Sequence, residues 1–185
     1  MDETALMILV KEGDEEAFKR IVEKYWKPIL NLCFQYVGNQ EDAEEVAQDV
    51  FIRLYRAATS YEPRAKLSTY LYRIAVNLSL NRIRDRKWKH LVSRDFILKG
   101  EQKNSASSEI CGPDSLLERK EEQRIVREAI DSLPANQRTA VILKRFHGLS
   151  YKEIAEVMNC SVSAVEARLH RAKQNLRERL KALIS

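Results

Sequence analysis

Apolar residues recur every three or four positions over most of the chain, which is the spacing of a helix with one buried face. In the first half this pattern predicts helices over residues 17–37 and 41–54, and a third that begins near Ser68 and continues through RIRDRKWKH. Pro28 predicts a kink or a restart in the first helix, and Gly38 predicts its end. No alternating stretch of strand length occurs, so we predict an all-α protein.

Residues 99–115, KGEQKNSASSEICGPDS, break every periodicity and are rich in Ser and Gly. A structureless segment of this length is uncommon inside a compact domain. We therefore predict two small helical domains, over residues 1–94 and 116–185, joined by a flexible linker over 95–115. A long surface loop within one domain is the alternative.

The C-terminal part predicts helices over 116–133 and 137–146, followed by two helices joined by a short turn at Asn159 and Cys160. Ser150 and Glu153 have capping-box spacing at the start of the first of these two, and Ser161 or Ser163 caps the second.

Apolar positions set the buried faces of this pair of helices. The first helix is expected to bury Ile154, Ala155 and Met158, and the second a stripe that includes Val162 and Val165. Because helices joined by so short a turn cross steeply, the second protrudes, which is the arrangement of a helix-turn-helix.

The protruding helix has the composition of a helix that enters the major groove of DNA. Small residues at its start (Ser163, Ala164 and Ala167) let the backbone approach the bases. Arg168 is placed to reach a guanine, and Arg171 and Lys173 to reach phosphates. An ordinary helical hairpin with a solvated basic face is the alternative.

The net charge of +5 on 185 residues is unevenly distributed. Residues 1–50 carry 5 Lys/Arg against 12 Asp/Glu, residues 51–115 carry 13 against 6, and residues 116–185 carry 14 against 9. An acidic start and two basic sections predict two kinds of partner, since only the basic sections attract phosphates.

Other features exclude several protein classes. No apolar run is long enough to span a membrane, and the N-terminus lacks the pattern of a signal peptide. Cys33, Cys111 and Cys160 form no paired motif, so we expect free thiols, without assigning a redox role, in a cytoplasmic protein. Three scattered histidines and the lack of a phosphate-binding glycine loop argue against an enzyme. We expect no catalytic residue, no metal and no cofactor.

The chain resembles the extracytoplasmic-function (ECF) group of bacterial sigma-70 factors. The segment QEDAEEVAQDVFIRLYRA is similar to the core of the family's first conserved stretch, and LSTYLYRIAVNLSLNRIR resembles its promoter-melting helix. LPANQRTAVILKRFHGLSYKEIAEVMNCSVSAVEARLHRAK resembles its C-terminal helix-turn-helix. The resemblance implies an initiation factor that binds core RNA polymerase, directs it to promoter DNA and assists melting. It also implies an anti-sigma partner, a chain that is monomeric when free or 1:1 with that partner, and no membrane insertion.

Site residues follow from the resemblance for the polymerase contact and for Tyr61 and Asn77, and from residue chemistry for most other DNA-binding positions. Polymerase binding falls on Asp42, Glu45, Gln48, Asp49 and Phe51. Recognition of the −10 element falls on Tyr61, Arg64, Lys66, Tyr70, Arg73, Asn77, Arg82, Arg84, Arg86 and Lys87. Recognition of the −35 element falls on Ser163, Ala164, Glu166, Ala167, Arg168, Arg171 and Lys173.

The residue chemistry agrees in part with these assignments. Asp42, Glu45 and Asp49 form one acidic helical stripe, which suits a basic protein partner, although a solvated charged face is the ordinary reading. Tyr61 and Asn77 supply the ring and the amide that capture of an unstacked base needs. Alternatively, Tyr61 is a core aromatic and Asn77 a surface residue.

The sequence departs from the family pattern at several positions, including Tyr70 where Trp is usual and Glu166 where Lys or Arg is usual. Glu166 can accept a hydrogen bond from a cytosine amino group or repel phosphate. A second hypothesis is a dimeric helix-turn-helix regulator that binds an operator without polymerase. It gives the acidic start no role.

Overall fold

The computed structural model describes residues 3–61, 66–96 and 115–184, with side chains described at 3–61, 66–89 and 123–181. Every regular element in these ranges is helical, which confirms the all-α prediction. In chain order they are α1 (Glu3–Lys11), α2 (Glu15–Val37), α3 (Gln40–Ala57), the 3-10 helix η1 (Ala58–Ser60), α4 (Leu67–Phe96), α5 (Ser115–Asp131), α6 (Ala135–Arg145), α7 (Tyr151–Met158) and α8 (Val162–Ile184). The proposed linker over 95–115 lies largely outside the described residues, so the domain boundaries stay predictions.

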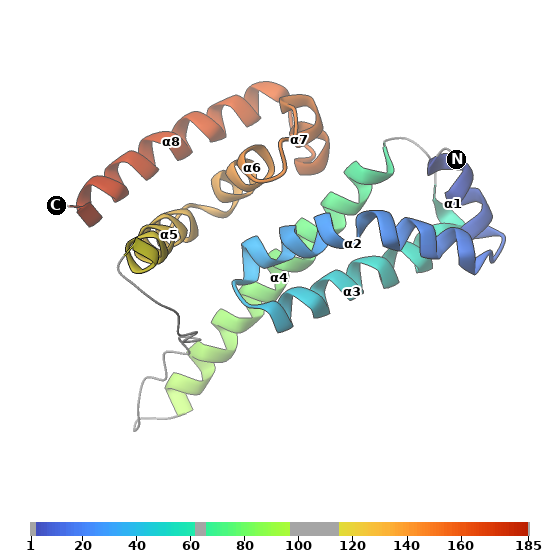
Figure 1. Cartoon of the computed structure of the whole chain (residues 1–185), viewed down its shortest axis with the longest axis horizontal. Coiled ribbons are helices and arrows are strands. Elements are labelled where there is room, and N and C mark those ends of the chain that lie inside the picture. Colours follow the sequence, from blue (N-terminus) through green and yellow to red (C-terminus); the bar gives the residue numbers. More distant parts are fainter. Residues whose placement is uncertain (1–2, 62–65, 97–114, 185) are drawn as a thin grey trace.

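The N-terminal domain consists of α2, α3 and α4 packed side by side, with α1 against α2 and η1 (Figure 1). Helix α2 ends as predicted at Gly38, which has φ 83° and whose N–H donates to the carbonyl of Phe34. The helix runs unbroken through Pro28, so the restart that we considered does not occur. Burial of Tyr25 before Pro28 and of Ile29 after it stabilises the helix at the missing N–H.

The sequence pattern located the buried face of α3 correctly. Its predicted apolar stripe is buried in full: Ala43, Val46, Ala47, Val50, Phe51 and Leu54. Helix α1 was not predicted from periodicity, yet it buries Leu6, Met7 and Val10. Helix α4 starts at Leu67, so Ser68 lies inside its first turn and is not the N-cap.

The C-terminal domain contains the predicted helix-turn-helix, formed by α7 and α8. Ser150 caps α7 in a complete capping box with Glu153, and Asn159 ends that helix in the left-handed conformation at φ 49°. The Ser161 hydroxyl accepts from the N–H of Ala164, which decides between the two candidate caps of α8. Val162 is 38% exposed, so its predicted burial is wrong; it stands in the first turn of α8, and Val165 is the first residue of that helix to be fully buried.

The two domains are in contact with each other. Helix α7 packs on the N-terminal part of α4, and α6 reaches the C-terminal end of α2 (Figure 1). The α8 helix lies along the outer side of its domain in the same view. We call the contact of α2 and α4 with α5, α6 and α7 the interdomain seam.

Candidate functional site

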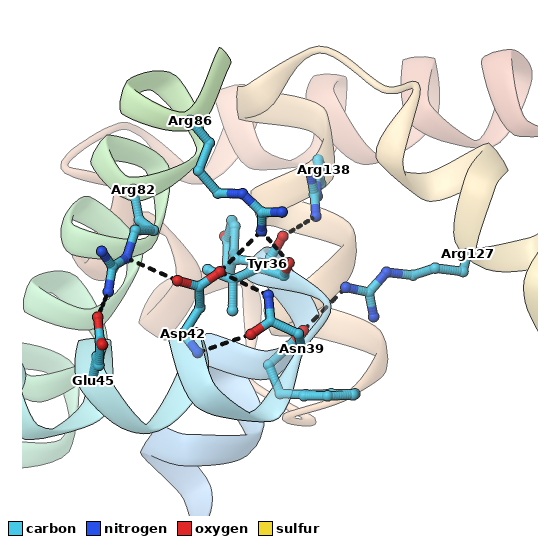
Figure 2. Close-up of polar contacts among 10 residues, drawn as sticks. Tyr36, Asn39, Asp42, Glu45, Arg82, Arg86, Arg127 and Arg138 are labelled. Carbon is cyan, nitrogen blue, oxygen red and sulfur yellow. Dashed lines mark hydrogen bonds and ion pairs between the residues drawn. The ribbon is translucent and has the colours of Figure 1, made fainter. Parts of the chain in front are cut away.

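The acidic stripe of α3 lies beside the end of α2, where several arginines converge (Figure 2). Asp42 accepts from the Asn39 side-chain amide at 2.7 Å, while the Asn39 side chain in turn accepts from the Asp42 N–H. The carboxylate of Asp42 also lies 3.0 Å from the Arg86 guanidinium and 3.4 Å from that of Arg82. Arg82 additionally pairs with Glu45.

These contacts join residues that the sequence assigned to different partners. Asp42 and Glu45 were assigned to polymerase, whereas Arg82 and Arg86 were assigned to DNA. In this structure the two sets neutralise each other across α3 and α4. Because the side chains involved are partly exposed, each pair is weak and exchangeable with an outside partner.

The remaining polymerase candidates differ in exposure. Gln48 and Asp49 are exposed on the outer face of α3. Phe51 is 4% exposed and stacks against Trp26 with ring centroids 5.9 Å apart, so it supports the helix from the core. Ile52 and Tyr55, about half exposed, line an open groove beside Phe51; sequence reasoning had not singled them out.

Four of the −10 candidates form one stripe along α4. Lys66 immediately precedes the helix, and Tyr70, Arg73 and Asn77 follow it at intervals of three or four residues, so the side chains share a face. Tyr61 packs edge-to-face on Tyr70 with ring centroids 5.7 Å apart, and burial raises the pKa of Tyr61. Lys66 and Asn77 are exposed. We call Lys66, Tyr70, Arg73 and Asn77 the α4 stripe.

Helix α7 contacts two members of the α4 stripe. Lys66 Nζ lies 3.3 Å from a carboxylate oxygen of Glu153, and Arg73 donates to the backbone carbonyl of Glu156 at 2.6 Å. Hydrogen bonds from the Ser150 backbone and hydroxyl, and then from Lys66, hold the pKa of Glu153 below its usual value. Glu153 is therefore an ionised carboxylate at neutral pH, and it forms an ion pair with Lys66.

The other −10 candidates lie toward the far end of α4. Arg84 and Lys87 are exposed, and Arg84 lies 3.9 Å from Asp85. Trp88, which the sequence assignment had not included, directly follows Lys87 and is 68% exposed. Arg64 lies outside the described residues.

The −35 candidates lie on α8, on the outer side of the C-terminal domain (Figure 1). Ser163, Glu166, Ala167, Arg171 and Lys173 are exposed, and Ala164 is half-buried.

Arg168 differs from its neighbours on α8. Its guanidinium points back to the turn and donates to Cys160 Sγ at 3.0 Å. To reach a base, Arg168 has to give up this contact.

The interdomain seam contains two residues that sequence reasoning did not identify as functional. Arg138 is only 7% exposed, and its guanidinium donates to the carbonyls of Tyr36 and Gln35 at the end of α2 (Figure 2). His147 lies against Tyr72 with ring centroids 5.3 Å apart, and burial lowers the pKa of this imidazole to about 4. Its immediate sequence neighbours, Gln137 and Thr139, are polar, so nothing in the local sequence marks Arg138 as a buried residue.

Among the described residues no group of three or more His, Cys, Asp or Glu side chains is arranged to hold a metal ion. Within the same ranges no helix is both long and apolar enough to cross a membrane.

Comparison with known proteins covers both domains. The family description "Sigma-70 region 2" matches residues 21–89, and "Sigma-70, region 4" matches residues 123–176. The chain is 36% identical over 178 residues to the ECF RNA polymerase sigma factor SigW of Bacillus subtilis (strain 168), covering 94% of each protein. It is 33% identical over 186 residues to the ECF RNA polymerase sigma-E factor of Escherichia coli (strain K12), covering 100% of this chain and 97% of that one.

Solved structures show the same fold at lower identity. The structure of CnrH in complex with the cytosolic domain of CnrY matches 96% of this chain and 96% of that chain, with a TM-score of 0.68 and 23% identity. Sequence kinship over nearly the whole length, with both conserved regions in order, settles the classification. The chain belongs to the ECF RNA polymerase sigma factors of the sigma-70 family, which are transcription initiation factors and not enzymes.

Proposed function

We propose that this sigma factor divides its contacts among three surfaces: the acidic stripe of α3 for core RNA polymerase, the α4 stripe for the −10 strand, and the start of α8 for the −35 duplex. The observation that carries this proposal is the α4 stripe. It places two cations, an aromatic ring and an amide on one face of a single rigid helix.

For polymerase, the proposal uses Glu45, Gln48 and Asp49, with Asp42 joining once it exchanges Arg82 and Arg86 for basic groups of the partner. The half-exposed Ile52 and Tyr55 extend this surface with apolar area, which a stable protein contact requires. Phe51 holds the helix in place from beneath.

For the −10 strand, the ring of Tyr70, supported by Tyr61, offers a platform on which a base can stack, and Asn77 offers hydrogen bonds to a base edge. Stacking one base contributes about 1–3 kcal/mol, whereas opening each base-pair step costs about 1.4 kcal/mol. Melting therefore needs several captures together with the contacts of polymerase. Arg84, Lys87 and the exposed Trp88 extend the surface toward the adjoining DNA.

For the −35 duplex, Ser163, Ala164 and Ala167 present a small surface to the major groove. Glu166 accepts from a cytosine amino group, and Arg168 donates to guanine after leaving Cys160. Arg171 and Lys173 contact phosphates.

We also propose an anti-sigma protein as regulatory partner, a monomeric free chain, and action in the cytoplasm, where the polymerase works. Two relatives support the first point. The CnrH structure contains the cytosolic domain of CnrY, and a second structural match (TM-score 0.64, 22% identity, 89% of this chain and 96% of that chain) is the sigma factor RpoE with the anti-sigma factor NepR from Bartonella quintana.

The experiment is run-off transcription with purified core polymerase on a library of promoter fragments, with and without this chain. We expect new transcripts from promoters that share −35 and −10 sequences, and absence of such transcripts would contradict the proposal. Failure of the chain to co-migrate with core polymerase in gel filtration would contradict it as well. Asn77→Ala should reduce selectivity at −10 positions. Arg171→Ala should weaken binding at all promoters alike and lower the salt slope by about one.

A further inference from the structure

The interdomain seam, taken with the proposed roles of the α4 stripe, has a consequence for the free chain. The helix α7 belongs to the domain assigned to the −35 element, yet it lies on the helix assigned to the −10 element. The contact engages the two cations of the stripe: Lys66 faces Glu153, and Arg73 donates to the Glu156 carbonyl.

The same contact covers the residues beside the stripe. Thr69 is 3% exposed, and its hydroxyl lies 3.4 Å from the Glu156 carboxylate. Tyr72 is packed against His147. A DNA strand that followed the stripe from Lys66 to Asn77 would meet α7 at Arg73, and it would meet the charges of Glu153 and Glu156.

The second part of the seam explains what keeps the domains together. The buried guanidinium of Arg138 donates to two carbonyls at the end of α2, forms an ion pair with Asp131 at 2.7 Å, and lies over the Tyr36 ring. The Tyr36 hydroxyl donates to Thr139 at 2.9 Å, and Arg127 donates to the Phe34 carbonyl at 3.0 Å. The carbonyls at the C-terminal end of a helix carry partial negative charge, so the end of α2 attracts the guanidinium groups of Arg127 and Arg138.

The seam contains buried polar atoms that lack hydrogen-bond partners in the described part of the chain, which favours a contact that can separate. Within the described residues, four buried side-chain atoms lack a hydrogen-bond partner. Three of them, Arg73 Nε, Arg138 Nε and His147 Nε2, lie at the seam, and the fourth is the fully buried Ser79 Oγ on α4. Unsatisfied polar groups are rare in permanent cores. Separation of the domains returns these nitrogens to water.

We propose that the free chain is autoinhibited by its own helix-turn-helix: α7 occupies the cations of the α4 stripe, and insertion of Arg138 into the end of α2 holds this closed form. The proposal rests on the function proposed for the α4 stripe. The −35 face of α8 stays exposed in the closed form, so closure restricts only the −10 contact.

The test compares Arg138→Gln with Arg145→Gln in the full-length chain. Both variants remove one positive charge from α6, but Arg145 is exposed at the end of the helix and makes no hydrogen bond or ion pair with a described residue. Small-angle scattering measures the radius of gyration, and fluorescence anisotropy measures affinity for a labelled short single-stranded oligonucleotide. Circular dichroism checks the helix content.

We expect Arg138→Gln to be more extended and to bind the oligonucleotide at least about fivefold more tightly than wild type, because the open fraction increases. Arg145→Gln should bind slightly more weakly, as loss of a cation alone requires. Equal affinity of the two variants, or an unchanged radius of gyration for Arg138→Gln, would overturn the proposal.

A second variant covers the case in which Arg138→Gln does not fold. Lys66→Cys with Glu153→Cys, in a background of Cys111→Ser and Cys160→Ser, is bridged with a short bismaleimide; the buried Cys33 stays unreacted. The bridged protein should lose oligonucleotide binding relative to the same protein capped with a monofunctional maleimide. Equal binding overturns the proposal. Neither measurement uses polymerase, so failure here is separate from failure in the transcription assay.

Discussion

At the scale of single residues, Asp42 shows how one side chain serves both stability and function. It is held by the Asn39 amide and two guanidinium groups, all within the N-terminal domain. Its neighbour Asp49 lies on the same helix and is exposed. The two positions therefore separate the structural effect of a carboxylate from its effect on partners.

Asp42→Asn should lower the free energy of unfolding by about 1 kcal/mol, because the arginines lose a charged acceptor in a partly exposed site. Asp49→Asn should change it by less than about 0.5 kcal/mol. Urea denaturation measures both values. A larger loss for Asp49→Asn would contradict this account, while under the proposed function both variants weaken binding to core polymerase.

His147 predicts a pH dependence at the same scale. Its pKa is about 4 in the folded chain against an ordinary 6.5, so the unfolded chain binds the additional proton between these values. Stability is therefore full above pH 6.5 and falls as the pH drops toward 4, by an amount on the order of 2 kcal/mol. His147→Gln should flatten this slope, measured by urea denaturation at several pH values, whereas the exposed His170→Gln should retain it.

At the scale of elements, local sequence determines where the helices of the helix-turn-helix begin and end. Ser150 and Glu153 satisfy each other's backbone at the start of α7, and Asn159 ends the helix. Ser161 caps α8. These capping interactions join residues three or four positions apart, so they could be predicted from the sequence without knowledge of the fold.

Ser150→Ala should lower the free energy of unfolding by about 1 kcal/mol, because the N–H of Glu153 loses its acceptor. Ser163→Ala is the matched control, since the Ser163 hydroxyl contacts only that of Ser161 among the described residues. Thermal denaturation compares the two variants. Equal loss in both would indicate that the capping box contributes nothing.

At the scale of the whole molecule, the interdomain seam makes the two domains one cooperative unit. Buried side chains run continuously from α1–α4 into α6, α7 and α8. Unfolding of either domain exposes the seam of the other, so the domains should melt together.

Calorimetry of the wild-type chain should therefore give a single transition, whereas Arg138→Gln should give two, one for each domain. The reason is that the variant removes the guanidinium that donates to two carbonyls at the end of α2. Two transitions in the wild type, or one in the variant, would contradict this coupling. Arg145→Gln should match the wild type.

Much of the site was predictable because its residues lie on helices whose faces follow from spacing. The buried stripe of α3 lies where periodicity placed it, and Glu166, Ala167 and Arg171 are exposed on the face of α8 opposite its apolar stripe. The exposure of Asn77 agrees with the alternative that it is a surface residue. Phe51 was assigned to the polymerase surface by motif position, yet the same periodicity had already put it on the apolar face, and the structure buries it. Val162 was predicted to be buried but is exposed. Helical spacing shows which face of α8 is apolar, but it does not show how far along that face the neighbouring helices extend.

The sequence by itself determined the helical class, the caps, the two conserved regions and the separation of acidic from basic sections, since each depends on near neighbours along the chain. Only the tertiary structure decided which charges meet. Asp42 with Arg86, Arg138 with the end of α2, and Lys66 with Glu153 join residues more than 40 positions apart. Helical spacing tells which face of a helix is buried, but the partner of that face depends on how the helices pack.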